Sequence, residues 1–138
     1  MSYDKPMPLI DVWNRPFWEA CREGRLIAQK CLQSGEVWFP PAPISPVSRT
    51  EQWEWVHLSG MGRVASWVVF HKGYFKGFSA ELPYVVAQID LQEGPSLLSN
   101  LIDVEASEIT TGMPVEVVFQ NAAEGMLIPC FKKRKDAA

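Results

Sequence analysis

Two short segments decide the fold: Cys-Leu-Gln-Ser-Gly at residues 31–35 and, after a proline-rich spacer, Ser-Pro-Val-Ser at residues 45–48. Cysteine at Ser34, Ser45 and Ser48 would give the pattern C-x2-C-x10-C-x2-C, a spacing suited to a structural zinc ribbon. Zinc in such a site needs thiolate or imidazole ligands, and a serine hydroxyl is a poor substitute. The sequence therefore predicts the frame of a metal site without its metal chemistry.

A short helix is expected before this frame. Asn14 is a good N-cap, Pro16 suits the first turn, and Gly24 is a C-terminal stop signal. Within the helix, Phe17, Ala20 and Cys21 share one apolar face, and the neighbouring Trp13 and Trp18 widen it. So many large side chains on a short helix must dock on the protein's own barrel or on a partner. Two short strands are expected next, at residues 26–31 and 36–39, on either side of a turn.

Short β runs at regular spacing follow from about residue 52, which predicts a small barrel. Strands are expected at residues 52–59, 63–71, 83–91, 96–103, 115–120 and 126–131, with one short helical turn at 104–109. Five or six strands with a turn before the later pair suit an OB-type barrel. The expected fold is therefore mainly β, with an arm, helix and degenerate ribbon at residues 1–50 and an OB-fold domain at residues 51–138.

Composition and charge narrow the function classes. The chain has 138 residues and a formal net charge of −3, and four of its basic residues lie together at positions 132–135. An acidic body argues against binding to a phosphate backbone, so no nucleic-acid partner is expected. Three cysteines form no disulfide framework, and neither a secretory signal nor a membrane span is apparent in the sequence. A cytoplasmic location is expected.

Several segments, taken in order, resemble a known family. They are the run from Phe17 to Cys31, Phe39-Pro40-Pro41, Pro83-Tyr84-Val85-Val86-Ala87, Leu98-Ser99-Asn100-Leu101 and Gly112-Met113-Pro114-Val115-Glu116-Val117. Their order is similar to that of the zinc-ribbon/OB-fold acyl-CoA-associated proteins, catalogued as domain of unknown function thirty-five. The resemblance covers residues 14–131 and departs from the family at the metal positions, where Cys31 is kept and Ser34, Ser45 and Ser48 replace cysteine.

The resemblance implies an N-terminal helix, a rubredoxin-like zinc ribbon and a C-terminal OB fold. It also implies a non-catalytic accessory subunit that assembles with a thiolase-fold enzyme, a retro-aldolase or acyltransferase. Such an enzyme acts on acyl-CoA carbon–carbon bonds, as in steroid side-chain or fatty-acyl metabolism. A CoA thioester is then the substrate of the complex. Because the ligand positions have changed, no zinc and no other stably bound cofactor is expected.

Two surfaces are candidates for contact with the partner or with acyl-CoA. The first is the helix face with Trp13, Phe17 and Trp18. The second is a loop between barrel strands that carries Lys72, Tyr74, Phe75, Lys76 and Phe78. Its aromatics either contact a partner or the acyl channel, or pack locally over the barrel mouth. The basic run at 132–135 is either a solvated tail or a contact for CoA phosphates or an acidic partner.

No catalytic residues are predicted. His57 and His71 lie on different expected strands, and neither shares a motif with a serine or a carboxylate. Cys21 and Cys130 lack an expected neighbouring base, and no phosphate-binding or nucleophile-elbow motif is present. The alternative to an accessory subunit is a free-standing acyl-CoA-binding OB-fold protein, which would bind CoA thioesters as a monomer.

Overall fold

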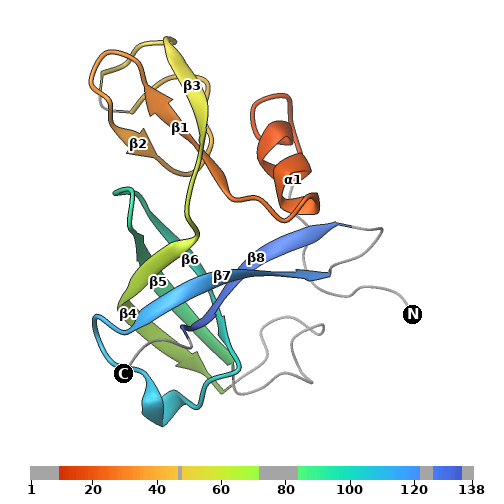
Figure 1. Ribbon diagram of the computed structural model, residues 1–138, viewed down its shortest axis with the longest axis vertical. Helices are drawn as coiled ribbons and strands as arrows, with labels where there is room; N and C mark the ends of the chain where they lie inside the picture. Colours follow the sequence, from red (N-terminus) through yellow and green to blue (C-terminus); the bar gives the residue numbers. More distant parts are fainter. Residues whose placement is uncertain (1–9, 47, 72–83, 122–125, 135–138) are drawn as a thin grey trace.

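The computed structural model describes residues 10–46, 48–71, 84–121 and 126–134, and Figure 1 shows their arrangement. A short helix lies beside a small sheet, and both sit at one end of a barrel. The expected mainly β architecture, with an N-terminal helix and ribbon followed by an OB-type barrel, is confirmed.

Helix α1 (Arg15–Arg22) forms where the capping signals place it. Pro16 lies in its first turn, and Gly24 follows its end with a φ of 75°. The Asn14 side chain does not cap the helix; its Oδ1 accepts a hydrogen bond from the Asp11 backbone N–H at 2.8 Å. Phe17, Ala20 and Cys21 are buried, as the apolar stripe predicted.

The ribbon is a three-stranded sheet in the order β2-β1-β3. Its strands are β1 (Ile27–Cys31), β2 (Val37–Trp38) and β3 (Trp53–His57), all paired antiparallel. The prediction that the strand near residues 52–59 opens the barrel is wrong, because β3 pairs with β1 over its whole length. β3 continues the ribbon sheet beyond residue 50. The division of the chain into residues 1–50 and 51–138 stays a proposal.

Side chains attach the proline-rich segment to this sheet. The Gln29 amide is fully buried and makes two hydrogen bonds with Ala42, to its carbonyl at 2.7 Å and from its N–H at 2.8 Å. Trp53 Nε1 donates to the Pro43 carbonyl at 2.9 Å. Trp38 packs edge-on against Trp53, with ring centroids 6.3 Å apart. These contacts attach the proline-rich segment to the ribbon sheet.

The barrel closes in the order β4-β5-β6-β8-β7. Its strands are β4 (Met61–Phe70), β5 (Tyr84–Leu91), β6 (Ser96–Ile102), β7 (Pro114–Asn121) and β8 (Leu127–Lys133), with the 3-10 turn η2 (Ala106–Glu108) between β6 and β7. Within the described part of the barrel, β6 and β8 are the one parallel pair. An irregularity between Val64 and Ser66 bends β4, so that its start pairs with β7 as well as β5. This is the strand order of an OB fold.

One apolar core joins the helix and the barrel. Ile89, Val115 and Phe131 are fully buried inside the barrel, and Phe17 and Cys21 of α1 belong to the same cluster. The helix packs beside β8 (Figure 1). The ribbon contributes Ile27 to this cluster, so its position relative to the barrel is set by core packing.

Among the described residues, no helix is long and apolar enough to span a membrane.

Two valines of β4 give a matched test of this core. Val64 is 1% exposed, whereas Val68 on the same strand is 59% exposed. Val64→Ala should lower the free energy of unfolding by about 2 kcal/mol, because it removes buried methyl groups and leaves a cavity. Val68→Ala should change it by less than about 0.5 kcal/mol. Urea unfolding followed by circular dichroism measures both, and equal losses would contradict the described burial.

Candidate functional site

The structure brings the four ribbon positions together. Cys31 Sγ lies 2.9 Å from Ser48 Oγ, which bridges the two segments. The Ser34 backbone N–H donates to Cys31 Sγ at 3.4 Å, and the Ser48 backbone N–H donates to Ser45 Oγ at 3.3 Å. Cys31 and Ser45 are both buried. These contacts join the four positions that the spacing singled out.

The donor set of this cluster does not fit zinc. It offers one thiol and three hydroxyls, whereas a structural zinc site takes four thiolate or imidazole ligands. Among the described residues, no three side chains of His, Cys, Asp and Glu gather as a metal site would require. Hydrogen bonds from the side chains of Ser34 and Ser48 lower the pKa of Cys31 to about 6, while burial of the thiol acts in the opposite direction. The hydroxyls of Ser34 and Ser48 thus act as hydrogen-bond partners of the sulfur.

Cys21, Cys130 and His57 are the other side chains that could act in catalysis. Burial raises the pKa of Cys21 to about 12, which keeps that thiol protonated. Cys130 is buried, with Sγ 3.5 Å from Gln120 Oε1. His57 is exposed and lies 3.4 Å from an Arg25 guanidinium nitrogen, which is no partner for general-base chemistry. These three side chains form no nucleophile–base pair with one another.

An apolar groove runs between the helix and the barrel, and we call it the junction groove. One part encloses about 400 Å³ between α1, the cis-linked Phe39–Pro40 segment, β6 and the start of β8. A second hollow of about 430 Å³ adjoins it and shares Phe39, Pro40, Leu97 and Leu98. Leu98 is 73% exposed at the groove, a large apolar side chain left open to solvent.

The predicted helix residues have different roles here. Phe17 is 2% exposed and packs on Trp18 and Phe39, with ring centroids 5.0 and 5.3 Å away, so it supports the groove wall. Trp18 lines the groove beside it. Trp13 is 47% exposed just before Asn14, which also lines the groove. The loop residues Lys72, Tyr74, Phe75, Lys76 and Phe78 lie outside the described residues.

Leu98 is a groove residue that the sequence analysis did not select as a contact. The sequence did contain a pattern that predicts this exposure. Leu97 and Leu98 are consecutive on one strand, so only one of them can face the core. Leu97 is buried and Leu98 is exposed.

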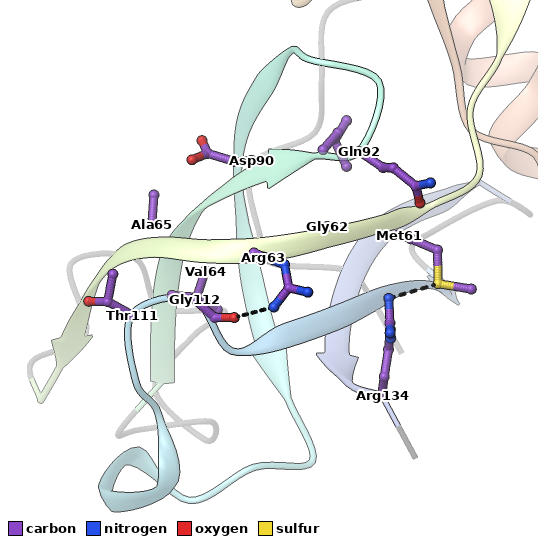
Figure 2. Close-up of a pocket in the computed structure, with 11 residues that line it drawn as sticks. Met61, Gly62, Arg63, Val64, Ala65, Asp90, Gln92, Thr111, Gly112 and Arg134 are labelled. Carbon is purple, nitrogen blue, oxygen red and sulfur yellow. Dashed lines mark hydrogen bonds between the residues drawn. The ribbon is translucent and has the colours of Figure 1, made fainter. Parts of the chain in front are cut away.

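A separate hollow of about 690 Å³, which we call the arginine hollow, lies on the outside of the barrel and is shown in Figure 2. Arg63 and Arg134 both line it. Arg63 Nη1 donates to the Gly112 carbonyl at 2.9 Å, and Arg134 Nη1 lies 3.6 Å from Met61 Sδ. In Figure 2 both guanidinium groups lie along the seam between β4 and β7.

Strand register explains why these two arginines line the same hollow. Arg63 pairs with Pro114 across β4 and β7, and the Arg134 backbone N–H donates to the Pro114 carbonyl at 3.2 Å. Opposite residues of neighbouring strands project from the same face, so both side chains leave the barrel on one side. Two guanidinium groups beside one hollow suit an anion such as a phosphate or a carboxylate. Arg134 belongs to the basic run that is predicted to be either a solvated tail or a contact for CoA phosphates or an acidic partner, whereas no sequence motif singles out Arg63.

Comparison with protein families matches both parts of the chain. Residues 18–44 match the rubredoxin-like zinc ribbon domain of ChsH2, and residues 55–120 match the C-terminal OB-fold domain of ChsH2. The two matches occur in the same order as the ribbon and barrel in the structure.

Individual relatives extend the likeness over nearly the whole chain. A DUF35 domain-containing scaffold protein of Pyrococcus furiosus is 37% identical over 134 residues, which is 94% of each chain. A probable enoyl-CoA hydratase alpha subunit of Thermomonospora curvata is 34% identical over 128 residues. That match covers 93% of this chain but only 40% of the hydratase subunit, so the present chain spans less than half of that relative.

A solved structure gives the same result in three dimensions. One chain of the structure described as "Ltp2-ChsH2(DUF35) aldolase" superposes with a TM-score of 0.82 at 32% sequence identity. The match covers 92% of this chain and 98% of that one. Helix, ribbon and barrel are therefore shared as a unit, and the chain belongs to the DUF35 family of proteins with a ChsH2-type zinc ribbon and OB fold.

Proposed function

We propose that this chain is a non-catalytic accessory subunit that assembles with a thiolase-fold enzyme acting on acyl-CoA carbon–carbon bonds. The observation that carries the proposal is the likeness to one chain of the structure described as "Ltp2-ChsH2(DUF35) aldolase", which covers 92% of this chain and 98% of that one. The thiolase fold of the partner is what the family resemblance of the sequence implies. In this proposal the partner performs retro-aldol or Claisen-type chemistry, and a CoA thioester is the substrate of the complex.

The surface of the chain supports a subunit role. Trp13 and Leu98 are large, exposed and apolar, and both lie at or next to the junction groove. Val12 beside Trp13 is also exposed. Exposed apolar groups around a groove are typical of protein interfaces. The partner would cover the helix face, the groove and the outer side of β6, and would contact Trp13 and Trp18 directly, while the buried Phe17 supports the groove wall.

The proposal includes no bound cofactor for this chain. The ribbon is that of a zinc-ribbon family, but its donor set of one thiol and three hydroxyls argues against zinc in this member. A cytoplasmic location, expected from the sequence, is part of the same proposal because CoA thioesters are substrates of metabolism inside the cell.

Affinity capture tests the subunit proposal. The tagged chain, expressed in its native host, should retain a thiolase-like protein in a stoichiometric complex, identified by mass spectrometry and sized by light scattering. Leu98→Asp and Trp13→Ala should each weaken retention at least tenfold, because hot-spot apolar side chains commonly contribute 2 kcal/mol or more to binding.

Val68→Asp is the matched control, since Val68 is also apolar and more than half exposed but lines neither part of the junction groove. It should leave retention unchanged. A clean monomer without an enzyme partner would contradict the subunit proposal. Equal losses for Val68→Asp and Leu98→Asp would contradict the proposed surface.

The arginine hollow supports the alternative function, a free-standing acyl-CoA-binding protein. Its two guanidinium groups suit the phosphates of CoA as well as an acidic partner. Calorimetry with acetyl-CoA separates the two functions. The subunit proposal predicts only weak binding to the isolated chain, whereas the alternative predicts saturable 1:1 binding.

Binding through this hollow should weaken about tenfold in Arg63→Gln, because a charged hydrogen bond contributes about 1.5–3 kcal/mol. The exposed Arg22 on the helix provides the control variant Arg22→Gln. Tight binding that Arg22→Gln weakens as much as Arg63→Gln would argue against the hollow as the site.

A further inference from the structure

The two segments of the ribbon have the same backbone geometry. In the first, the Gly35 N–H donates to the Cys31 carbonyl at 2.8 Å, four residues back. In the second, the Arg49 N–H donates to the Ser45 carbonyl at 2.9 Å, also four residues back. Gly35 has a φ of 77° and Arg49 a φ of 57°, so both turns end in the left-handed region.

The side-chain contacts repeat as well. In the first segment the Ser34 backbone N–H, three residues after Cys31, points at the Cys31 thiol sulfur at 3.4 Å. In the second segment the Ser48 backbone N–H, three residues after Ser45, points at the Ser45 hydroxyl oxygen at 3.3 Å. The segments are thus two copies of one turn, and each directs N–H groups toward the atom that would be a metal ligand.

Arg49 shows that this geometry is imposed on the second segment. An arginine rarely adopts positive φ, because its Cβ approaches the following carbonyl oxygen at a cost of about 1–2 kcal/mol. Glycine occupies the equivalent position of the first segment without that cost. The second turn therefore keeps its shape against the preference of its own residue.

We propose that these turns are a paired-knuckle metal frame in which the contact between the Cys31 thiol and the Ser48 hydroxyl, the Cys31–Ser48 bridge, has replaced the metal. The frame itself is retained, so that thiolates at all four positions would bind a tetrahedral divalent ion such as Zn²⁺ or Co²⁺. The inference concerns only the ribbon and is independent of the proposed partner.

Other contacts explain how the frame keeps its shape without an ion. Structural zinc supplies about 10 kcal/mol or more to a small module that folds around it. Here the buried Gln29 amide binds both backbone groups of Ala42, and Trp53 binds the Pro43 carbonyl. These bonds fasten the segment that leads into Ser45 onto β1 and β3. The four positions are then held in place from outside the site.

The decisive experiment rebuilds the site in the full-length chain. The triple variant Ser34→Cys, Ser45→Cys and Ser48→Cys should bind one Co²⁺ per chain, with the sulfur-to-cobalt charge-transfer and d–d absorption of a tetrahedral thiolate site. The unmodified protein should show neither band and should contain no stoichiometric zinc by mass spectrometry. A fourth substitution, Cys31→Ala, leaves three thiolates and is the matched control, which should bind cobalt more weakly and without the full tetrahedral spectrum.

Two results would overturn the proposal. One is stoichiometric zinc in the unmodified protein, which would mean that the bridge has not replaced the metal. The other is a folded triple variant, with an unchanged circular dichroism spectrum, that fails to bind cobalt. That result would mean that the frame is no longer shaped for a metal.

A single substitution tests the bridge even if the triple variant does not fold. Ser48→Ala removes the hydroxyl beside the buried thiol and should lower the melting temperature by about 3–6 °C. Ser66→Ala, at an exposed position of β4, is the control and should shift it by no more than about 1–2 °C. Equal melting temperatures for Ser48→Ala and the unmodified protein would show that the bridge does not hold the ribbon.

Discussion

The packing of α1 onto the barrel is the interaction on which the other features depend. Phe17 and Cys21 enter the same apolar core as Ile89 and Phe131, so the helix, the ribbon and the barrel share one buried cluster. Because close-packed cores resist displacement, the ribbon takes one position relative to the barrel. That position creates the junction groove, whose walls come from α1, the Phe39–Pro41 segment and two barrel strands. A subunit that must present a defined surface to a partner benefits from such rigidity.

The ribbon matches a zinc ribbon domain, although serine stands at three of its four ligand positions. Zinc joins two turns by bonds to four side chains, and its loss removes the strongest contact of a small module. In this chain other contacts surround the frame: a buried amide, a tryptophan hydrogen bond and edge-on packing of Trp38 on Trp53. The ribbon also packs on the barrel core through Ile27. A ribbon with that support has less need of an ion than an isolated zinc module.

Local patterns predicted most of the elements. The start signals at Asn14 and Pro16 and the stop at Gly24 predicted the helix, although the Asn14 side chain makes no cap. Alternation and turn residues predicted β5 to β8 within one or two residues. The assignment of β3 to the barrel failed because a strand's sequence does not identify its neighbour, and β3 pairs with β1 more than twenty residues earlier. For the site, the spacing of Cys31, Ser34, Ser45 and Ser48 predicted a cluster. Arg63 was missed because its approach to Arg134 depends on pairing between distant strands.

The sequence by itself determined the class of fold, the family and the loss of zinc ligands, because these follow from residue type, spacing and order along the chain. The tertiary structure alone decided which exposed side chains share a surface. Leu98 and Trp18 line one groove, and Arg63 and Arg134 line one hollow, although 80 and 71 positions separate them in the sequence. Barrel closure and core packing bring such residues together, and both are properties of long-range register that local pattern does not encode.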